Sequence, residues 1–272
     1  MEYSEWIGKT QERAEVITSK HVAKLAVTLN EQAPADGSPL PLLWHWAYFQ
    51  DLAFTESLRS DGHPVTGDFL PAAGDRTRMW AGGRLSFIKP LLVGGLVHRR
   101  STIEDIKEKQ GRTGSLLFVK VRHEYLQDED TALIEEQDIV YRVATQAIVA
   151  EGDPLPDAEW TEEIDASPTL LFRYSAVTFN THRIHYDWRY VTEVEGYPGL
   201  VVHGPLTATL VMRAFSKFAP EVTVRTFAFK GVRPLIAGDA LIVGGRVEEE
   251  GRAAVWAGNK GGIGQLGEIG FA

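Results

Sequence analysis

The sequence predicts an α+β protein made of two similar units. Each half of the chain runs through a short lead-in, a loop and an apolar helical segment, and then through strand-like runs. Two short matches relate the halves: 89–94 (KPLLVG) matches 233–238 (RPLIAG), and 27–30 (VTLN) matches 177–180 (VTFN). An acidic segment with three prolines, 151–168, lies between the halves and is the best candidate for a linker.

The first half, residues 1–150, is expected to combine helices with an antiparallel sheet. Apolar and charged residues at helical spacing over 3–25 predict one or two amphipathic helices. The run LLWHWAYFQDLAF, residues 42–54, predicts a very aromatic buried helix. Over 84–149 the runs alternate, carry β-branched residues and are cut by glycines, as in an antiparallel sheet. Two polar segments rich in proline or glycine are expected to be mostly loop: 31–41 and 58–82.

The second half, residues 165–272, is expected to repeat this order around a buried helix. Gly204 and Pro205 open the helix, since proline at the first helical position loses no hydrogen bond. Apolar residues cover most of the circumference of the segment 204–219, which indicates burial rather than a surface position. These residues are Leu206, Leu210, Val211, Ala214, Phe215 and Phe218. Strands are predicted over about 222–271.

The composition describes an ordinary soluble protein without cysteine chemistry. Hydrophobic residues make up 44% of the 272 residues and charged residues 24%. The net charge of −9 disfavours attraction to nucleic acid or to an anionic membrane, so an anionic ligand needs a local basic pocket. The absence of cysteine removes disulfides, thiolate catalysis and cysteine metal ligands. The opening MEYSEWIGKT does not resemble a signal peptide and no apolar run reaches membrane-spanning length, so the expected location is cytoplasmic.

The chemically distinctive residues gather within the segment 172–218. Residues 180–187 (NTHRIHYD) contain two histidines and an acid, and residues 203–205 (HGP) begin the buried helix. Free amide hydrogens and the helix dipole favour negative charge at such a helix start. Histidine titrates near neutral pH and can take up and return a proton. Together these features predict acid–base chemistry on a carbonyl compound.

Other chemistries fit the sequence less well. His182 and His185 would lie on opposite faces of a strand, and no third ligand stands at a typical distance, so no metal is expected. Ser175, His185 and Asp187 could form a triad on paper, but no serine is flanked by the glycines of a nucleophile elbow. No phosphate-binding glycine loop is present, and GNKGGIG near the C-terminus does not open a helix. Nucleotide hydrolysis and dinucleotide binding are therefore disfavoured.

The motifs at 179–187 (FNTHRIHYD) and 199–206 (GLVVHGPL) resemble the catalytic half of MaoC-type hydratases, which have the hot-dog fold. More narrowly, the chain is similar to mesaconyl-CoA and itaconyl-CoA hydratases and to the 3-hydroxyacyl-thioester dehydratases of mitochondria. The resemblance covers nearly the whole chain, including the LLWHW segment and the run that ends at Arg142. It implies a double hot-dog, in which each unit wraps an antiparallel sheet around a central helix and the two sheets meet edge to edge. The unit without the catalytic motif is 1–150, and the unit with it is 165–272.

The resemblance also implies roles for residues of the motif. The R-specific enoyl-CoA hydratases carry GDxNPxH there, with the aspartate and the histidine as the catalytic pair. In this chain the histidine falls on His185, the family's asparagine on His182 and the aspartate on Asn180. An amide cannot act as a base, but the mesaconyl and itaconyl type also carries asparagine there, so Asn180 is expected to hold the water. The oxyanion-binding glycine falls on Gly204.

Four residues of the same motif are candidates for substrate binding: Arg183, His182, Tyr186 and Asp187. An arginine fork suits the free carboxylate of a C5 dicarboxylic acyl group, and Arg183 is the first candidate, before Arg173 and Arg189. Asp187 is also the nearest replacement base if a carboxylate is required. The coenzyme A phosphates need basic residues, for which the candidates are Arg84, Lys89, Lys230 and Arg233.

The resemblance implies a hydro-lyase that adds water reversibly across the double bond of a short enoyl-CoA. Itaconyl-CoA or mesaconyl-CoA would give a citramalyl-CoA-type product, with coenzyme A as part of the substrate and no separate cofactor. Two alternatives stay open, a fatty-acid-type 3-hydroxyacyl-thioester dehydratase and a hot-dog acyl-CoA thioesterase, because the fold alone does not choose between them. A non-catalytic thioester binder is disfavoured by the retained histidine and glycine. A homodimer without nucleic-acid or membrane partners is expected.

Overall fold

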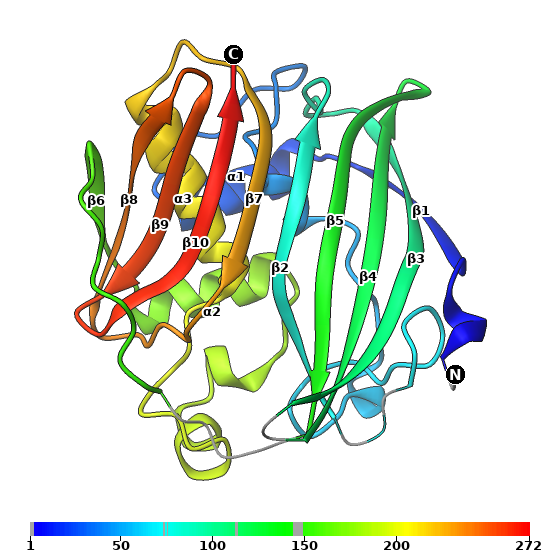
Figure 1. Cartoon of the computed structure of the whole chain (residues 1–272). Coiled ribbons are helices and arrows are strands. Elements are labelled where there is room, and N and C mark those ends of the chain that lie inside the picture. The colour runs from blue at the N-terminus through cyan, green and yellow to red at the C-terminus, as the bar shows by residue number, and fades with distance from the viewer. Residues whose placement is uncertain (1–2, 73, 75, 112–113, 144–148) are drawn as a thin grey trace.

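The computed structural model describes residues 3–72, 74, 76–111, 114–143 and 149–272. Its framework is a ten-stranded antiparallel sheet with the order β1-β3-β4-β5-β2-β7-β10-β9-β8-β6 (Figure 1). The predicted α+β class is therefore confirmed. The predicted strand region of the first half extends over 144–148, which lie outside the described residues.

The two halves of the sheet repeat one topology. The first half contains β1 (Thr10–Val16), β2 (Thr77–Phe87), β3 (Leu96–Gly111), β4 (Gly114–Gln127) and β5 (Asp130–Arg142). The second half contains β6 (Trp160–Asp165), β7 (Val224–Gly231), β8 (Ala240–Glu249), β9 (Arg252–Asn259) and β10 (Gly262–Phe271). The order β1-β3-β4-β5-β2 recurs as β6-β8-β9-β10-β7, and the halves meet edge to edge through β2 and β7. A Cβ on Gly82 would stand 2.4 Å from the Phe229 carbonyl oxygen, so glycine permits this close contact.

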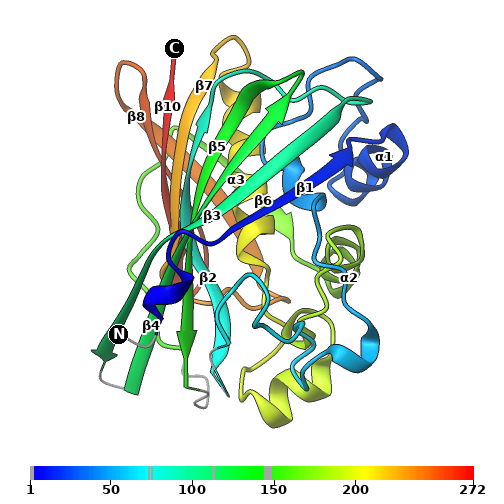
Figure 2. The ribbon, with the colours of Figure 1, turned by 90° about the vertical axis from the view of Figure 1, so that its right-hand side faces the viewer.

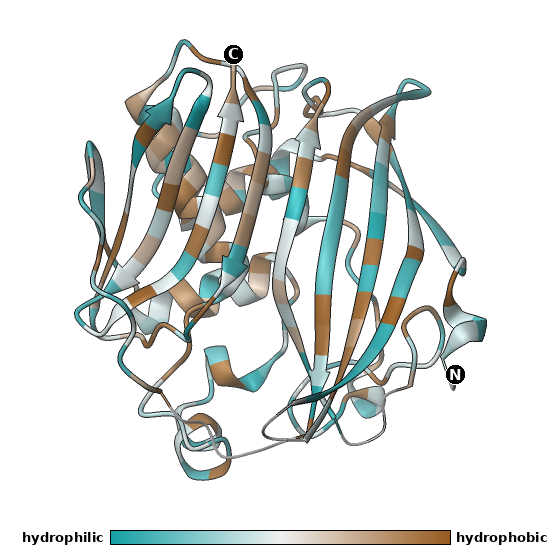
Figure 3. Cartoon of the chain, viewed as in Figure 1, coloured by the Kyte–Doolittle hydropathy of each residue, from teal (hydrophilic) through white to brown (hydrophobic). Residues whose placement is uncertain are grey.

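In the described part of the chain, three α-helices accompany the sheet: α1 (Ser19–Thr28), α2 (Pro168–Val177) and α3 (Gly204–Phe218). Nine of the fifteen residues of α3 are buried, and the helix packs against the second half of the sheet, as its apolar circumference predicted. Figure 2 shows α1 and α2 on the same side of the sheet as α3. Along strands such as β4, buried and partly exposed residues alternate, and Figure 3 shows the matching alternation in hydropathy. No helix among the described residues is long and apolar enough to cross a membrane.

The predicted aromatic helix at 42–54 is wrong. Only Trp44–Ala47 forms a single 3-10 turn, and left-handed backbone at Leu43 (φ 70°) and Phe49 (φ 59°) stops a helix from continuing on either side. The buried carboxylate of Glu135 on β5 accounts for this conformation, because it takes hydrogen bonds from both side chains of the turn. Trp46 Nε1 lies 2.8 Å from one Glu135 oxygen, and His45 Nε2 lies 3.2 Å from the other.

Two further expectations are corrected at the ends of the halves. Of the one or two helices expected over 3–25, one α-helix is present, α1, which begins at Ser19; Ser4–Trp6 is a single 3-10 turn, and Thr10–Val16 is strand β1 with alternating exposure rather than helix. The expected linker 151–168 contains the edge strand β6, which pairs with β8. The boundaries 1–150 and 165–272 stay a prediction, and β6 belongs with the second half of the sheet.

Candidate active site

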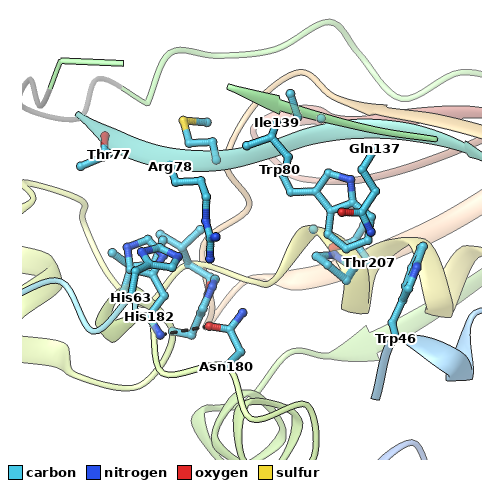
Figure 4. Close-up of a pocket in the computed structure, with 18 of the residues that line it drawn as sticks. Trp46, His63, Thr77, Arg78, Trp80, Gln137, Ile139, Asn180, His182 and Thr207 are labelled. Carbon is cyan, nitrogen blue, oxygen red and sulfur yellow. Dashed lines mark hydrogen bonds between the residues drawn. The ribbon is translucent and has the colours of Figure 1, made fainter. Parts of the chain in front are cut away.

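A cavity of about 570 Å³ lies between the two halves of the chain and receives side chains from both. The first half contributes residues of all five of its strands, β1 to β5, and of the irregular segments before β2. The second half contributes the predicted motif and the start of α3. Figure 4 shows His63, His182 and Asn180 toward one end and Trp46 and Gln137 toward the other, with Arg78 and Trp80 reaching in from β2. Among its described residues the first half has no long helix packed against its sheet, so the central helix expected for this unit is not found there, and the sheet is free to form one wall of the cavity.

His185 is held in the cavity wall as a neutral base. It closes the 3-10 turn Arg183–His185, and its Nδ1 donates a hydrogen bond of 2.7 Å to the carbonyl oxygen of Val201. Because that carbonyl only accepts, Nδ1 carries the proton and Nε2 keeps its lone pair. Burial lowers the pKa of His185 to about 4, although the Val201 hydrogen bond opposes this shift. The imidazole is therefore neutral at physiological pH.

His203 lies directly behind His185. The two rings stack with centroids 3.6 Å apart, and His203 is fully buried. Its Nε2 shares a 2.8 Å hydrogen bond with the Ser175 hydroxyl, and burial holds the pKa of His203 well below its usual value. The triad that could be written for Ser175, His185 and Asp187 is not assembled, because Ser175 contacts His203 instead. His203 thus positions the ring that faces the cavity.

Asn180 lies at the end of α2, where the chain turns into the motif. The Asn180 N–H donates to the carbonyl oxygen of Ser175 at 2.8 Å, and its Oδ1 accepts from the His182 N–H at 3.0 Å. The side-chain oxygen is thus engaged in the turn, while the amide group still lines the cavity with His185. Asn180 can donate a hydrogen bond to a ligand there, but it cannot take a proton.

Gly204 is the first residue of α3 and lies in the cavity wall. The first N–H groups of a helix have no partner within the helix, and Pro205 has no N–H at all. A Cβ on Gly204 would meet no atom within 4 Å, so open space adjoins the glycine. An oxygen that develops negative charge can occupy that space next to the helix N-terminus.

A loop of the first half that no sequence pattern predicted docks onto the motif. The Arg183 N–H donates to the Asp61 carbonyl oxygen at 2.9 Å, and the Thr181 hydroxyl donates to the Gly62 carbonyl oxygen at 2.5 Å. Gly62 has φ 90°, and a Cβ there would stand 1.9 Å from the Thr181 carbonyl oxygen. Figure 2 shows the two segments together on one side of the sheet. The signal available in the sequence was a glycine between an acid and a histidine, Asp61-Gly62-His63.

This loop brings an aspartate–histidine pair to the site. Asp61 Oδ1 accepts from the His63 N–H at 2.9 Å, and Asp61 Oδ2 lies 3.3 Å from His63 Nδ1. The ring of His63 packs on that of His182 with centroids 4.1 Å apart, and His182 lies edge-on to His185 at 5.5 Å. Burial opposes the ionisation of Asp61, but the hydrogen bonds from His63 outweigh it and lower the pKa of this carboxyl.

The ligand atoms of Asp61, His63 and His182 lie within 4.8 Å of one another, a spacing at which three groups could hold a metal ion. Both oxygens of Asp61 are already used by His63, so hydrogen bonding accounts for the arrangement without a metal. Burial lowers the pKa of His182 well below its usual value, and the neighbouring His63 and His185 lower it further. The ring of His182 is therefore neutral. The expectation of no metal stays a prediction.

The cavity provides the local basic pocket that an anionic ligand requires. Four arginines line it: Arg78, Arg99, Arg142 and Arg233. Within the described part of the chain, none of the four has a carboxylate within ion-pair distance. Arg78 points from β2 toward the end of the cavity where His63, His182 and Asn180 lie (Figure 4). Arg99 lies over the Phe49 ring in the first half.

Three predicted substrate-binding residues lie away from the cavity lining. Arg183 donates from Nε and Nη2 to one Asp187 oxygen at 3.0 and 2.7 Å, and its guanidinium stacks over Tyr190. Tyr186 donates from its hydroxyl to the Thr181 carbonyl oxygen. The structure thus brings His185, Asn180, Gly204 and His182 together, and does not bring Arg183, Tyr186 or Asp187 to them.

Most of the basic residues expected to bind the coenzyme A phosphates, and both alternative arginines for the acyl carboxylate, lie outside the cavity lining. Arg84 pairs with Glu136 and Asp138, and Lys89 pairs with Asp130. Arg189 pairs with Glu193. Lys230 and Arg173 lie outside the cavity lining, and only Arg233 among these candidates lines it.

Comparisons with known proteins show the family of the chain. The family model described as hydroxyacyl-thioester dehydratase type 2 matches residues 43–237. The chain is 43% identical over 236 residues to a mesaconyl-C(4)-CoA hydratase of Chloroflexus aurantiacus, covering 85% of this chain and 84% of that protein. It is 24% identical over 231 residues to a mitochondrial hydroxyacyl-thioester dehydratase type 2 of Schizosaccharomyces pombe, covering 73% and 75%.

A solved structure described as a MaoC-like dehydratase shares the fold, with a TM-score of 0.74, 15% identity and 97% of each chain covered. The repeated strand order and the buried α3 accordingly form the double hot-dog that the resemblance implied. The chain belongs to the hydroxyacyl-thioester dehydratase type 2 family of hydro-lyases.

Proposed function

We propose that this enzyme hydrates a short dicarboxylic enoyl-CoA, with mesaconyl-C4-CoA or itaconyl-CoA as substrate and a citramalyl-CoA-type product. The observation that carries the proposal is the pairing of a neutral His185, with its Nε2 available, and the open space beside Gly204 in one cavity. Hydration requires both a base for water and stabilisation of an enolate oxygen. The name of the Chloroflexus aurantiacus relative supports the substrate.

In the proposed reaction of mesaconyl-C4-CoA, whose double bond is conjugated with the thioester, the thioester carbonyl oxygen lies beside Gly204. Itaconyl-CoA has its double bond between Cβ and the methylene carbon, so it must first lose a proton from Cα and gain one at the methylene carbon, which converts it to mesaconyl-C4-CoA. The N–H of Gly204 and the N-terminal end of α3 stabilise the charge that collects on the thioester oxygen, a contribution of about 3–4 kcal/mol for one such donor. His185 Nε2 takes a proton from water as the water oxygen bonds to Cβ. The amide of Asn180 donates a hydrogen bond that holds the water in place.

Arg78 is proposed to bind the free carboxylate of the acyl group in place of Arg183. In mesaconyl-C4-CoA the carbon that receives the hydroxyl also carries this carboxylate, so a cation must lie close to Asn180 and His185. Arg78 points toward that end of the cavity and has no carboxylate partner among the described residues. A planar guanidinium suits a carboxylate because two N–H groups can contact both oxygens.

A fatty-acid-type 3-hydroxyacyl thioester is the second candidate substrate. The first half contributes several apolar side chains to the cavity lining, beside polar ones such as Gln137 and Arg99. The apolar residues are Trp46, Phe49, Trp80, Val121 and Ile139. Such a lining accommodates a longer alkyl chain than a C5 acid needs. His185, Asn180 and Gly204 would act on this substrate in the same way, because the negative charge collects on the same thioester oxygen.

The test is to incubate the protein with mesaconyl-C4-, itaconyl- and crotonyl-CoA and with longer 2-enoyl-CoAs, following enoyl absorbance and product mass. We expect the C5 substrates to give hydroxyacyl-CoA without free thiol. His185→Ala should lower turnover at least about 100-fold with the fold intact. Release of free coenzyme A from a saturated acyl-CoA would favour a thioesterase, and a preference for long chains would favour the second candidate.

A further inference from the structure

The motif segment itself offers no carboxylate to the cavity. Asn180 occupies the position of the family's aspartate, and Asp187 is held by Arg183 outside the cavity lining. The acid of the docked loop is different, because Asp61 is only 5% exposed and both its oxygens contact His63, which lines the cavity. The first half of the chain thus brings a buried carboxylate to the site through a histidine.

The geometry of this pair defines the state of its ring. A carboxylate at Nδ1 places the proton on that nitrogen and leaves Nε2 as the atom that can exchange a proton with a ligand. An aspartate in this position also stabilises the imidazolium that forms when the ring accepts a proton. The ring of His63 packs against His182, which in turn meets His185, so the three imidazoles occupy one end of the cavity.

We propose that His63, supported by Asp61, is the second proton-transfer residue of the hydration site and replaces the carboxylate that position 180 lacks. This inference rests on the proposed function. His185 Nε2 takes a proton from water while the water oxygen bonds to Cβ, and the C=C electron pair moves to form the enolate. The imidazolium of His63 then gives the proton on Nε2 to Cα, and the thioester carbonyl re-forms. His185 releases its proton to solvent and His63 takes one up, so one water is added and both residues return to their starting states.

In this step His63 is a catalytic residue and Asp61 a positioning residue. The charged and titratable groups that face His63 are Asp61 and Arg59 from its own loop, Arg78 from β2, and His182 with His185 from the motif. Burial, the largest cause, and the two arginines hold the pKa of His63 below its usual value, and the hydrogen bond and the charge of Asp61 oppose this shift. Loss of the Asp61 charge must therefore lower the pH up to which His63 can donate a proton.

The test uses Asp61→Asn, Asp61→Glu and His63→Gln, with His21→Gln as the matched control. His21 bonds to the Ala47 carbonyl oxygen outside the cavity lining. The rates kcat and kcat/KM are measured against pH on the best enoyl-CoA, with thermal unfolding of each variant. We expect His63→Gln to lower kcat about 100-fold or more and Asp61→Asn by a smaller factor, and Asp61→Glu to recover part of the loss. Asp61→Asn should also move the alkaline limb of kcat/KM to lower pH.

Three results would overturn the inference. The first is near wild-type kcat in both Asp61→Asn and His63→Gln. The second is a loss of activity in Asp61→Asn with an unchanged alkaline limb of kcat/KM, which would mean that the Asp61–His63 pair is purely structural. This measurement can be made even if His63→Gln does not fold. The third is loss of wild-type activity in EDTA that zinc restores, which would make the cluster a metal site. If the wild type hydrates no enoyl-CoA at all, the proposed function fails instead.

Discussion

Replacing Arg78 with methionine tests where the acyl carboxylate binds. Methionine keeps an unbranched apolar stem of similar reach but removes the guanidinium. Arg78 has no carboxylate partner within the described residues, so the fold loses no ion pair, and the thermal unfolding midpoint should stay within a few degrees of wild type. The effect should therefore appear in substrate selection rather than in stability.

The size of the effect follows from the interaction that is lost. A hydrogen bond to a charged group contributes about 1.5–3 kcal/mol. Each 1.36 kcal/mol of lost transition-state stabilisation corresponds to a factor of ten, so kcat/KM for mesaconyl-C4-CoA should fall by about 10- to 150-fold. Crotonyl-CoA has no free carboxylate, and its kcat/KM should change less than about 3-fold. The ratio of the two values is the decisive quantity, because it cancels any general loss of active enzyme.

Arg99→Met is the matched control, because Arg99 also lines the cavity without a carboxylate partner among the described residues but lies over Phe49 in the first half. We expect this variant to leave the ratio of mesaconyl-C4-CoA to crotonyl-CoA nearly unchanged. If Arg99→Met changes the ratio and Arg78→Met does not, the carboxylate binds at the other end of the cavity. The placement of Cβ beside Asn180 and His185 would then be refuted.

Three further predictions concern the glycines and the buried histidines. Gly204→Val should fold normally, because a Cβ there meets no atom within 4 Å, but it should raise KM and lower kcat by filling the space beside the helix start; unchanged kinetics would show that the thioester lies elsewhere. Gly62→Ala should displace the docked loop, because its Cβ would stand 1.9 Å from the Thr181 carbonyl oxygen and φ is 90°. We expect a loss of about 1–3 kcal/mol in the free energy of unfolding and a larger fractional loss of activity. Gly37→Ala is the control, because Gly37 also has positive φ but adjoins open space. Burial lowers the pKa of His123 and His185 to about 4 and that of His182 and His203 well below 6.5. The unfolded chain therefore binds more protons between about pH 6.5 and 4, and the free energy of unfolding should fall as pH decreases through this window, by up to about 1.4 kcal/mol per pH unit for each histidine. Urea midpoints that do not change between pH 7 and pH 5 would contradict this assignment.

The sequence by itself determined the elements whose apolar pattern is local. The circumference of the segment 204–219 predicted a buried helix, and α3 is that helix. The echoed fragments predicted two related halves, and the strand order repeats. Asn180, His182, His185 and Gly204 line one cavity, whereas Arg183, Tyr186 and Asp187 of the same motif do not. The helix start and the tight turns that hold the lining residues follow from short-range hydrogen bonds and dihedral preferences.

Only the tertiary structure decided the segments whose conformation depends on distant partners. The aromatic run at 42–54 was predicted to be a helix, but it forms only a short 3-10 turn. The side chains of Trp46 and His45 in this turn bind the buried carboxylate of Glu135 on β5. The polar loop around Asp61 and His63 carries no periodicity, yet it docks across more than a hundred residues of chain onto the motif. Arg183 stood inside the motif but is turned to Asp187, whereas Arg78 reaches the cavity from another strand. Long-range hydrogen bonds and ion pairs leave no periodic pattern in the sequence, so these contacts appear only once the chain is folded.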